Sequence, residues 1–185
     1  MNKLRLLTFI LLATFFIESC KKDTITGTAY TTADFQANIN GSTWAPDTLS
    51  TIITYNAAAK TKVFSVIGTK EQKQVIMSIT LSNADNSAGF TTGTYNVDGT
   101  TVKMQFNTQQ KNPQGVYVFL PHGTVSPGSG IINISAVDPV NKVITGTFSF
   151  YSRSSTTDGS GNTSITIDNI LGGVFNSTPY TFASN

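Results

Sequence analysis

The chain has 185 residues, the size of one ordinary domain or slightly more. Charged residues make up 12% of it, and 12 Lys and Arg nearly balance 10 Asp and Glu, leaving a formal net charge of +2. A charge this weak excludes a protein that binds nucleic acid through its phosphates. Hydrophobic residues at 39% still supply a core, and 29 threonines predict threonine-rich β structure.

The first residues have the pattern of an export signal. Lys3 and Arg5 precede an almost wholly apolar run over residues 6–17. As a helix, this run would rise only about 18 Å, less than the roughly 30 Å of a bilayer hydrocarbon core. The pattern therefore predicts a signal peptide over residues 1–19 rather than a transmembrane helix.

Cys20 is the only cysteine and directly follows this segment. The sequence Ile17-Glu18-Ser19-Cys20 resembles the lipobox of bacterial lipoproteins, although Glu18 departs from the small residue usual there. The resemblance implies that Cys20 is acylated, with fatty acids such as palmitate, and becomes the mature N-terminus. A free thiol or an intermolecular disulfide is the alternative, but an exposed thiol at this position would be open to oxidation. We therefore expect a lipid anchor in the bacterial envelope, at the outer membrane.

The mature chain divides into a tether and one domain. Residues 20–33 are small and polar, which favours a flexible tether. From residue 34 to residue 185, apolar and polar residues alternate in short runs that Gly, Asn, Asp and Pro interrupt, which is typical of β-strands. We predict strands over or near residues 35–39, 49–55, 62–68, 74–82, 93–97, 101–106, 115–120, 131–137, 142–152, 163–171 and 178–182.

The turn residues support an antiparallel arrangement. Asp98-Gly99 is a two-residue hairpin signal, residues 138–141 (Asp-Pro-Val-Asn) form a four-residue turn, and residues 158–162 form a glycine-rich hairpin tip. No segment of the mature chain has the apolar period of a capped helix. The sequence predicts an all-β fold, a single antiparallel β-sandwich, with a barrel-like variant left open.

Three phrases of the sequence are similar to a known family. They are Phe35-Gln-Ala-Asn-Ile-Asn-Gly-Ser-Thr-Trp44-Ala45, Gly93-Thr-Tyr95 and Ile144-Thr-Gly-Thr-Phe-Ser-Phe150. Together they resemble the poorly characterised β-sandwich lipoproteins of Bacteroidetes-type bacteria. The resemblance implies a fold and a location in the envelope, and it carries over no catalytic residue.

The residues for catalysis are few. His122 is the only histidine, and no Gly-x-Ser-x-Gly phrase presents a nucleophile for it, so we interpret it as an exposed loop histidine. One histidine without cysteine is too few for an ordinary zinc site. Most acids lie in predicted turns, whereas Asp168 lies within a predicted strand and is the candidate for a carboxylate-based glycan hydrolase.

Two further groups are weak candidates for ligand binding. Asp158, Ser160 and Asn162 alternate through one loop and could offer oxygens to calcium, but a hairpin tip explains them better. Trp44 could stack on a sugar ring, but a lone Trp in a domain of this size favours the core. We also expect a set of strand phenylalanines in the core, namely Phe64, Phe106, Phe119, Phe148 and Phe150.

These observations favour a membrane-anchored envelope lipoprotein without a cofactor. Its domain is expected to be a non-enzymatic binding module for a glycan, a peptide or a neighbouring envelope protein. Two alternatives stay open: a carboxylate-based glycan hydrolase and a purely structural envelope component.

Overall fold

A computed structural model describes residues 34–185. The predicted signal peptide, Cys20 and the tether lie outside the described residues. Within residues 34–185 the chain forms β-strands and no helix, arranged as two six-stranded sheets.

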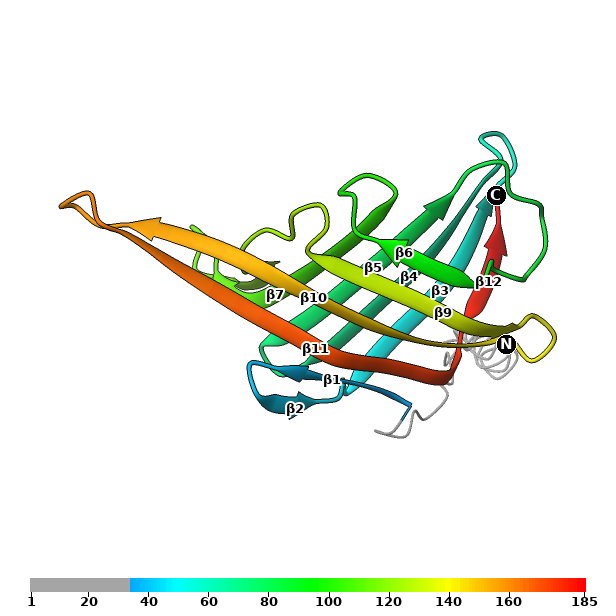
Figure 1. The fold of residues 1–185 in the computed structure, drawn as a ribbon, viewed down its shortest axis with the longest axis horizontal. Coiled ribbons are helices and arrows are strands. Elements are labelled where there is room, and N and C mark those ends of the chain that lie inside the picture. The colour runs from blue at the N-terminus through cyan, green and yellow to red at the C-terminus, as the bar shows by residue number, and fades with distance from the viewer. Residues whose placement is uncertain (1–33) are drawn as a thin grey trace, which may run out of the picture.

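The two sheets lie one over the other (Figure 1). The first sheet has the order β2 (Ser42–Trp44), β1 (Phe35–Ile39), β11 (Thr163–Pro179), β10 (Val143–Thr157), β9 (Gly130–Asp138), β6 (Gly93–Asn96). The second has the order β12 (Thr181–Ser184), β3 (Thr48–Asn56), β4 (Thr61–Lys70), β5 (Lys73–Leu81), β7 (Val102–Lys111), β8 (Tyr117–Pro121). All neighbours pair antiparallel except β12 and β3, which pair parallel.

The core fills the space between the sheets. Because successive side chains of a strand point to opposite faces, each strand contributes alternate residues to it. β1 buries Phe35, Ala37 and Ile39, and exposes the residues between them more. Facing them from the second sheet are apolar residues of β3, β4, β5 and β7, among them Ile53, Phe64, Val66, Val75, Met77, Ile79 and Phe106.

This arrangement confirms the predicted all-β class and decides between its two variants. Each sheet of the described chain keeps two edge strands, β2 and β6 in one and β12 and β8 in the other. The sheets therefore pack as a sandwich and do not close into a barrel.

Two glycines let aromatic rings lie directly on the backbone of the first sheet. A Cβ at Gly146 would come within 2.3 Å of the Phe175 ring, and a Cβ at Gly173 within 2.6 Å of the Phe148 ring. Gly146 and Phe175 pair across β10 and β11, as do Phe148 and Gly173, so each ring covers the glycine opposite it. The register shifts beside Gly146, which marks a β-bulge.

Two local predictions are wrong, and one short strand is not predicted. Asp98-Gly99 does not form a hairpin, because β6 pairs with β9 in the first sheet while β7 pairs with β5 in the second. Asp98 instead accepts backbone hydrogen bonds from Thr100, Thr101 and Val102, which turns the chain from one sheet to the other. The short edge strand β2 was not expected. Phe119 lies on edge strand β8 and is only partly buried.

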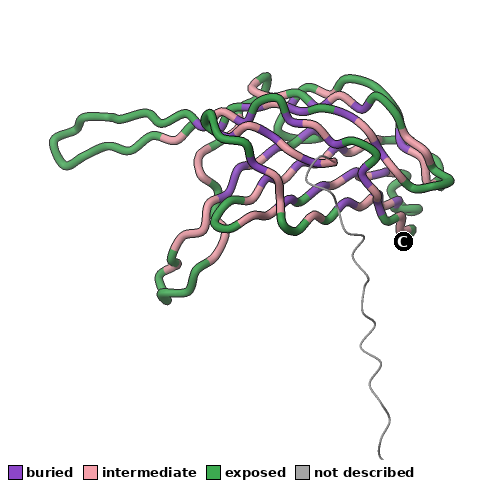
Figure 2. Tube along the Cα trace, turned by 90° about the horizontal axis from the view of Figure 1, so that it is seen from below, coloured by how far each residue is buried: buried purple, intermediate pink, exposed green. Residues whose placement is uncertain are grey.

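Strands β10 and β11 extend beyond the sandwich as a two-stranded arm. β9 pairs with β10 only from residue 143 to residue 150, and β1 pairs with β11 only from residue 170 to residue 175. Residues 151–157 and 163–169 pair with each other, so β10 continues beyond its predicted end at residue 152. β11 also continues beyond its predicted end at residue 171, to Pro179, but it does so within the sandwich, where it pairs with β1 and with the start of β10. The arm projects from one end of the molecule and is largely exposed (Figures 1 and 2).

Candidate functional site

The loop between β8 and β9 runs along the base of the arm. Thr124 and Arg153 form an isolated antiparallel bridge, with N–H to O distances of 2.8 Å and 2.9 Å. The N–H of Tyr151 donates to the carbonyl of Ser129 at 2.9 Å. The loop therefore continues the first sheet along β10 beyond Gly130, the residue at which β9 begins.

Gly123 allows this close approach. Its φ is +93°, and a Cβ there would lie 2.6 Å from the carbonyl carbon of Arg153 and 2.8 Å from the Ser152 hydroxyl. A glycine is thus required both by its left-handed conformation and by the backbone beside it. The contact holds the start of the loop against β10.

A chain of polar side chains ties the same loop to β11. The Nδ1 atom of His122 lies 2.6 Å from Oδ2 of Asp168, and the Asn40 amide donates to Oδ1 of Asp168 at 2.8 Å. The Asp168 carboxylate is buried, whereas the His122 side chain is 37% exposed. An ionised carboxylate only accepts hydrogen bonds, so with Asp168 in that form the donor of this contact is Nδ1–H of His122.

His122 also closes one end of the sandwich. Its ring lies edge-on to Phe106 of the second sheet, with centroids 6.0 Å apart. Its carbonyl accepts a hydrogen bond of 2.6 Å from the buried Ser152 hydroxyl of β10. The sequence predicts an exposed loop histidine; the structure places His122 in a loop with its side chain 37% exposed, and also shows contacts of its ring with Asp168 of the first sheet and Phe106 of the second.

The hydrogen bonds of His122, Asp168 and Ser152, which together we call the tie between the sheets, do not have the sequence of donors and acceptors of a catalytic triad. In such a triad, the serine hydroxyl donates to the imidazole, whereas Ser152 donates to the backbone carbonyl of His122. A carboxylate-based hydrolase needs a second carboxyl across a cleft, but the two oxygens of Asp168 contact the imidazole of His122 and the amide of Asn40. This geometry supports a structural role for His122 and Asp168.

The tie supports a groove on the outer face of the first sheet. The groove has a volume of about 470 Å³, within the range of roughly 300–1,000 Å³ usual for small-molecule sites. It is lined by Thr124, Ser126, Ser129, Tyr151, Arg153, Ile167 and Asn169. The loop supplies the hydroxyls, and the base of the arm supplies the remaining side chains.

A second hollow continues the groove across the sheet. Ser129 and Tyr151 line both hollows, and the second one extends to Asn96 and Ile131 on strands β6 and β9. Tyr151 lies between them and is 48% exposed. We call the two hollows together the Tyr151 groove. It presents an aromatic ring beside hydroxyl and amide groups, two isoleucines and Arg153.

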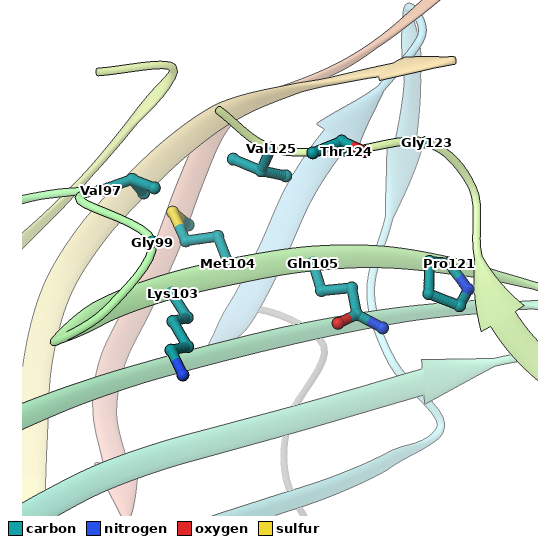
Figure 3. A pocket seen from close by; sticks show the side chains of 9 residues that line it. All are labelled: Val97, Gly99, Lys103, Met104, Gln105, Pro121, Gly123, Thr124 and Val125. Carbon is teal, nitrogen blue, oxygen red and sulfur yellow. The ribbon is translucent and has the colours of Figure 1, made fainter. Parts of the chain in front are cut away.

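Another cavity, of about 320 Å³, lies on the inner side of the same loop (Figure 3). Met104 points toward Val97 and Val125, which makes that wall apolar, while Lys103 and Gln105 point away from the loop (Figure 3). The lining of this cavity includes no aromatic side chain, whereas the Tyr151 groove is larger and contains an exposed tyrosine ring. The Tyr151 groove is therefore the better candidate for a binding site.

The sequence-predicted candidates lie elsewhere. Trp44 is buried, with its ring edge-on to Phe35 at 6.4 Å between centroids. The indole therefore packs in the core, the position that the sequence analysis favoured for it.

Asp158 closes the tip of the arm. Its carboxylate accepts hydrogen bonds from the N–H groups of Ser160 and Asn162 and from the Asn162 amide, and these bonds, led by the one from the Asn162 backbone, lower its pKa. This is the hydrogen bonding of a turn. No group of three or more His, Cys, Asp or Glu side chains in residues 34–185 is placed to hold a metal ion.

The groove residues were missed because their spacing carries no motif. Tyr151 and Arg153 stand on β10, Ile167 and Asn169 stand on β11, and the loop hydroxyls come from a third segment. The alternation of strand faces assigns the outward positions of each strand. Only the register of Tyr151 opposite Asn169, and of Arg153 opposite Ile167, brings them together.

The structure thus defines a two-sheet β-sandwich domain with a groove on one outer face. Residues 31–179 match a family described as a domain of unknown function, DUF6252, and the chain belongs to that family. The comparisons of this chain with curated proteins and with solved structures found no match. Within residues 34–185, no helix has the length and hydropathy needed to cross a membrane.

Proposed function

We propose that this protein is a membrane-anchored envelope lipoprotein whose sandwich binds a glycan in the Tyr151 groove. The observation that carries the proposal is the half-exposed Tyr151 ring in a groove whose lining combines hydroxyl and amide groups with the apolar side chains of Ile131 and Ile167. The anchor is Cys20, through the lipobox-like phrase that ends at it.

The chemistry of the groove fits a sugar. A tyrosine ring offers an apolar face to the C–H face of a pyranose, and its hydroxyl offers a polar handle. The hydroxyls of Ser126 and Ser129 and the amide of Asn169 can both donate and accept hydrogen bonds, as sugar hydroxyls require. These groups are held by paired strands and by the tied loop, so little conformational entropy is lost on binding.

The groove also has the shape for a chain rather than a single sugar. It crosses the strands from Asn96 on β6 to Asn169 on β11, with Tyr151 between its two hollows. A lipid anchor at Cys20 would hold the domain at the membrane surface, where envelope and extracellular glycans are within reach. We expect binding without cleavage.

The test of glycan binding compares two exposed tyrosines. The full chain, purified in mild detergent, is titrated calorimetrically with a panel of neutral and acidic oligosaccharides. Tyr151→Ala should weaken binding about tenfold or more, equivalent to about 1.4 kcal/mol. Tyr117→Ala is the matched control, because Tyr117 is 57% exposed on edge strand β8 of the other sheet. The proposal fails if no glycan binds or if the two variants bind equally.

The anchor has its own test. Cys20→Ser should move the protein from the membrane fraction to the soluble fraction of fractionated cells, because the acylated thiol is gone. Ser155→Thr, at an exposed position of the arm, is a conservative control outside the lipobox-like phrase and should leave the protein with the membranes. A Cys20→Ser protein that still sediments with membranes after a salt wash would contradict the lipid anchor.

A further inference from the structure

Arg153 differs from every other cation of the described chain. Residues 34–185 contain seven lysines and one arginine, and that arginine lines the Tyr151 groove. A guanidinium is a planar fork of donors that matches a carboxylate with two parallel hydrogen bonds, which a lysine ammonium cannot do.

The backbone of Arg153 is fixed on both sides. Arg153 pairs with Ile167 on β11 and forms a bridge with Thr124 of the loop, so its backbone is hydrogen-bonded within the sheet on both sides. Its neighbour Tyr151 lies on the same outer face, two residues along β10, a separation of about 7 Å. At this spacing the long side chain of Arg153 can reach a sugar ring that stacks on Tyr151.

No acid of the groove neutralises Arg153. Within residues 34–185 the ion pairs are Lys62 with Asp85 and His122 with Asp168, and neither includes it. Asp168 points inward to His122, and Asp158 at the arm tip lies about 17 Å along the strand from Arg153. The groove therefore offers one exposed, unneutralised guanidinium among uncharged groups.

Resting on the proposed function, we propose that the glycan is acidic. Arg153 binds the carboxylate of a uronic acid residue while Tyr151 stacks on a sugar ring. The uncharged remainder of the groove suits the hydroxyls of the same chain, and a single guanidinium suits sugars with spaced carboxylates rather than dense polyanions. Arg153 is thus the specificity-determining residue of the groove.

The experiment uses acidic tetrasaccharides with a matched neutral form. Tetramers of galacturonate, glucuronate and mannuronate, each as the free acid and as the methyl ester, are titrated into the full chain in mild detergent. A sulfated tetrasaccharide without carboxylates is titrated in the same way. At least one free acid should bind roughly 10- to 100-fold more tightly than its ester, the range expected for hydrogen bonds to a charged group. Raising the salt concentration should reduce that difference.

Three variants assign the effect to the guanidinium. Arg153→Gln should bring the affinity for the free acid down to that for the ester, and Arg153→Lys should recover only part of it. Lys103→Gln is the matched control, because it removes the same charge from an exposed position of β7 on the other sheet. Circular dichroism confirms that each variant is folded.

The outcomes separate the two proposals. If glycans bind through Tyr151 but every ester binds as tightly as its acid, or if Arg153→Gln changes nothing, the acidic-glycan inference is overturned while the proposed function stands. If a sulfated tetrasaccharide binds more tightly than every uronate, the assignment to a carboxylate is overturned. If no oligosaccharide binds, the proposed function itself fails.

Discussion

The body of the sandwich and its arm are built from the same two strands, and they differ in which face is apolar. In the body, β10 and β11 point Ile144, Phe148, Phe150, Ile170 and Phe175 toward the second sheet. In the arm, the same face carries Ser154, Thr156, Ser164 and Thr166, while Ile165 and Ile167 stand on the opposite face. The strands continue, but the core ends where their inward residues turn polar.

This comparison explains why the groove lies at the base of the arm. Two-stranded ribbons are marginally stable by themselves, so a precise site needs support from a sheet with a core. Tyr151 and Arg153 are the first outward residues of β10 beyond its pairing with β9, and the loop over residues 122–129 supports them. The site thus takes its rigidity from the body and its exposure from the arm.

The largest difference between the two regions should appear in stability. Phe150 is fully buried, so Phe150→Ala should lower the free energy of unfolding by about 3–5 kcal/mol through lost contacts and a residual cavity. Ile165→Ala in the arm, where the side chain is 51% exposed, should change it by no more than about 0.5 kcal/mol. Urea denaturation measures both. Equal losses would mean that the arm is part of the cooperative core.

The next effect tests the contact between loop and arm. Gly123→Ala and Gly128→Ala both place a side chain at positive φ, +93° and +80°, but only the first meets backbone atoms. Gly123→Ala should therefore cost about 1–3 kcal/mol more than Gly128→Ala, as overpacking does. It should also weaken glycan binding. Equal thermal midpoints for Gly123→Ala and Gly128→Ala would show that the loop can move away from β10 without loss of stability.

The tie between the sheets should have a similar or smaller effect. Asp168→Asn replaces a buried acceptor that His122 and Asn40 both contact, and it should cost about 1–3 kcal/mol. Combined with His122→Gln, the loss should be clearly less than the sum of the single losses, because both changes break one interaction. Chemical denaturation of the four proteins gives the coupling. Additive losses would show that His122 and Asp168 do not stabilise the fold through their mutual contact.

The smallest effect is expected at low pH, far from the groove. The Lys62 ammonium, together with the Ser87 hydroxyl, lowers the pKa of Asp85 from 3.8 to about 2 in the folded protein. Since the folded-state pKa is the lower one, this pair stabilises the fold above pH 3.8 and the contribution disappears as the pH falls through about 2.

Asp85→Asn should therefore reduce stability slightly at neutral pH and match the wild-type protein near pH 1.5. Thermal midpoints between pH 7 and pH 1.5 measure this convergence. Asp158→Asn is the comparison in the arm, where turn hydrogen bonds lower the pKa of the carboxylate without a cation. A midpoint difference between Asp85→Asn and wild type that grew on acidification would contradict the assigned sign.

The strands and most turns follow from the sequence because their causes are local. Alternating residues such as Phe35, Ala37 and Ile39 give β1, and Asp138 hydrogen-bonds to the N–H groups of Val140 and Asn141 in the predicted four-residue turn. The pairing of β9 with β10 confirms that turn. The hairpin predicted at Asp98-Gly99 is wrong for a non-local reason. A turn reverses the chain, but it does not specify whether the next strand pairs in the same sheet or in the other one.

The sequence by itself determined the all-β class, the strand faces and the polar composition of the surface, because these depend on side-chain periodicity and turn chemistry within a few residues. The tertiary structure alone decided the strand order, the projection of the arm and the site. His122 and Asp168 are 46 residues apart, and the groove combines a loop with two strands. Such contacts depend on which strands pair and in what register, and that choice is made by packing the whole core.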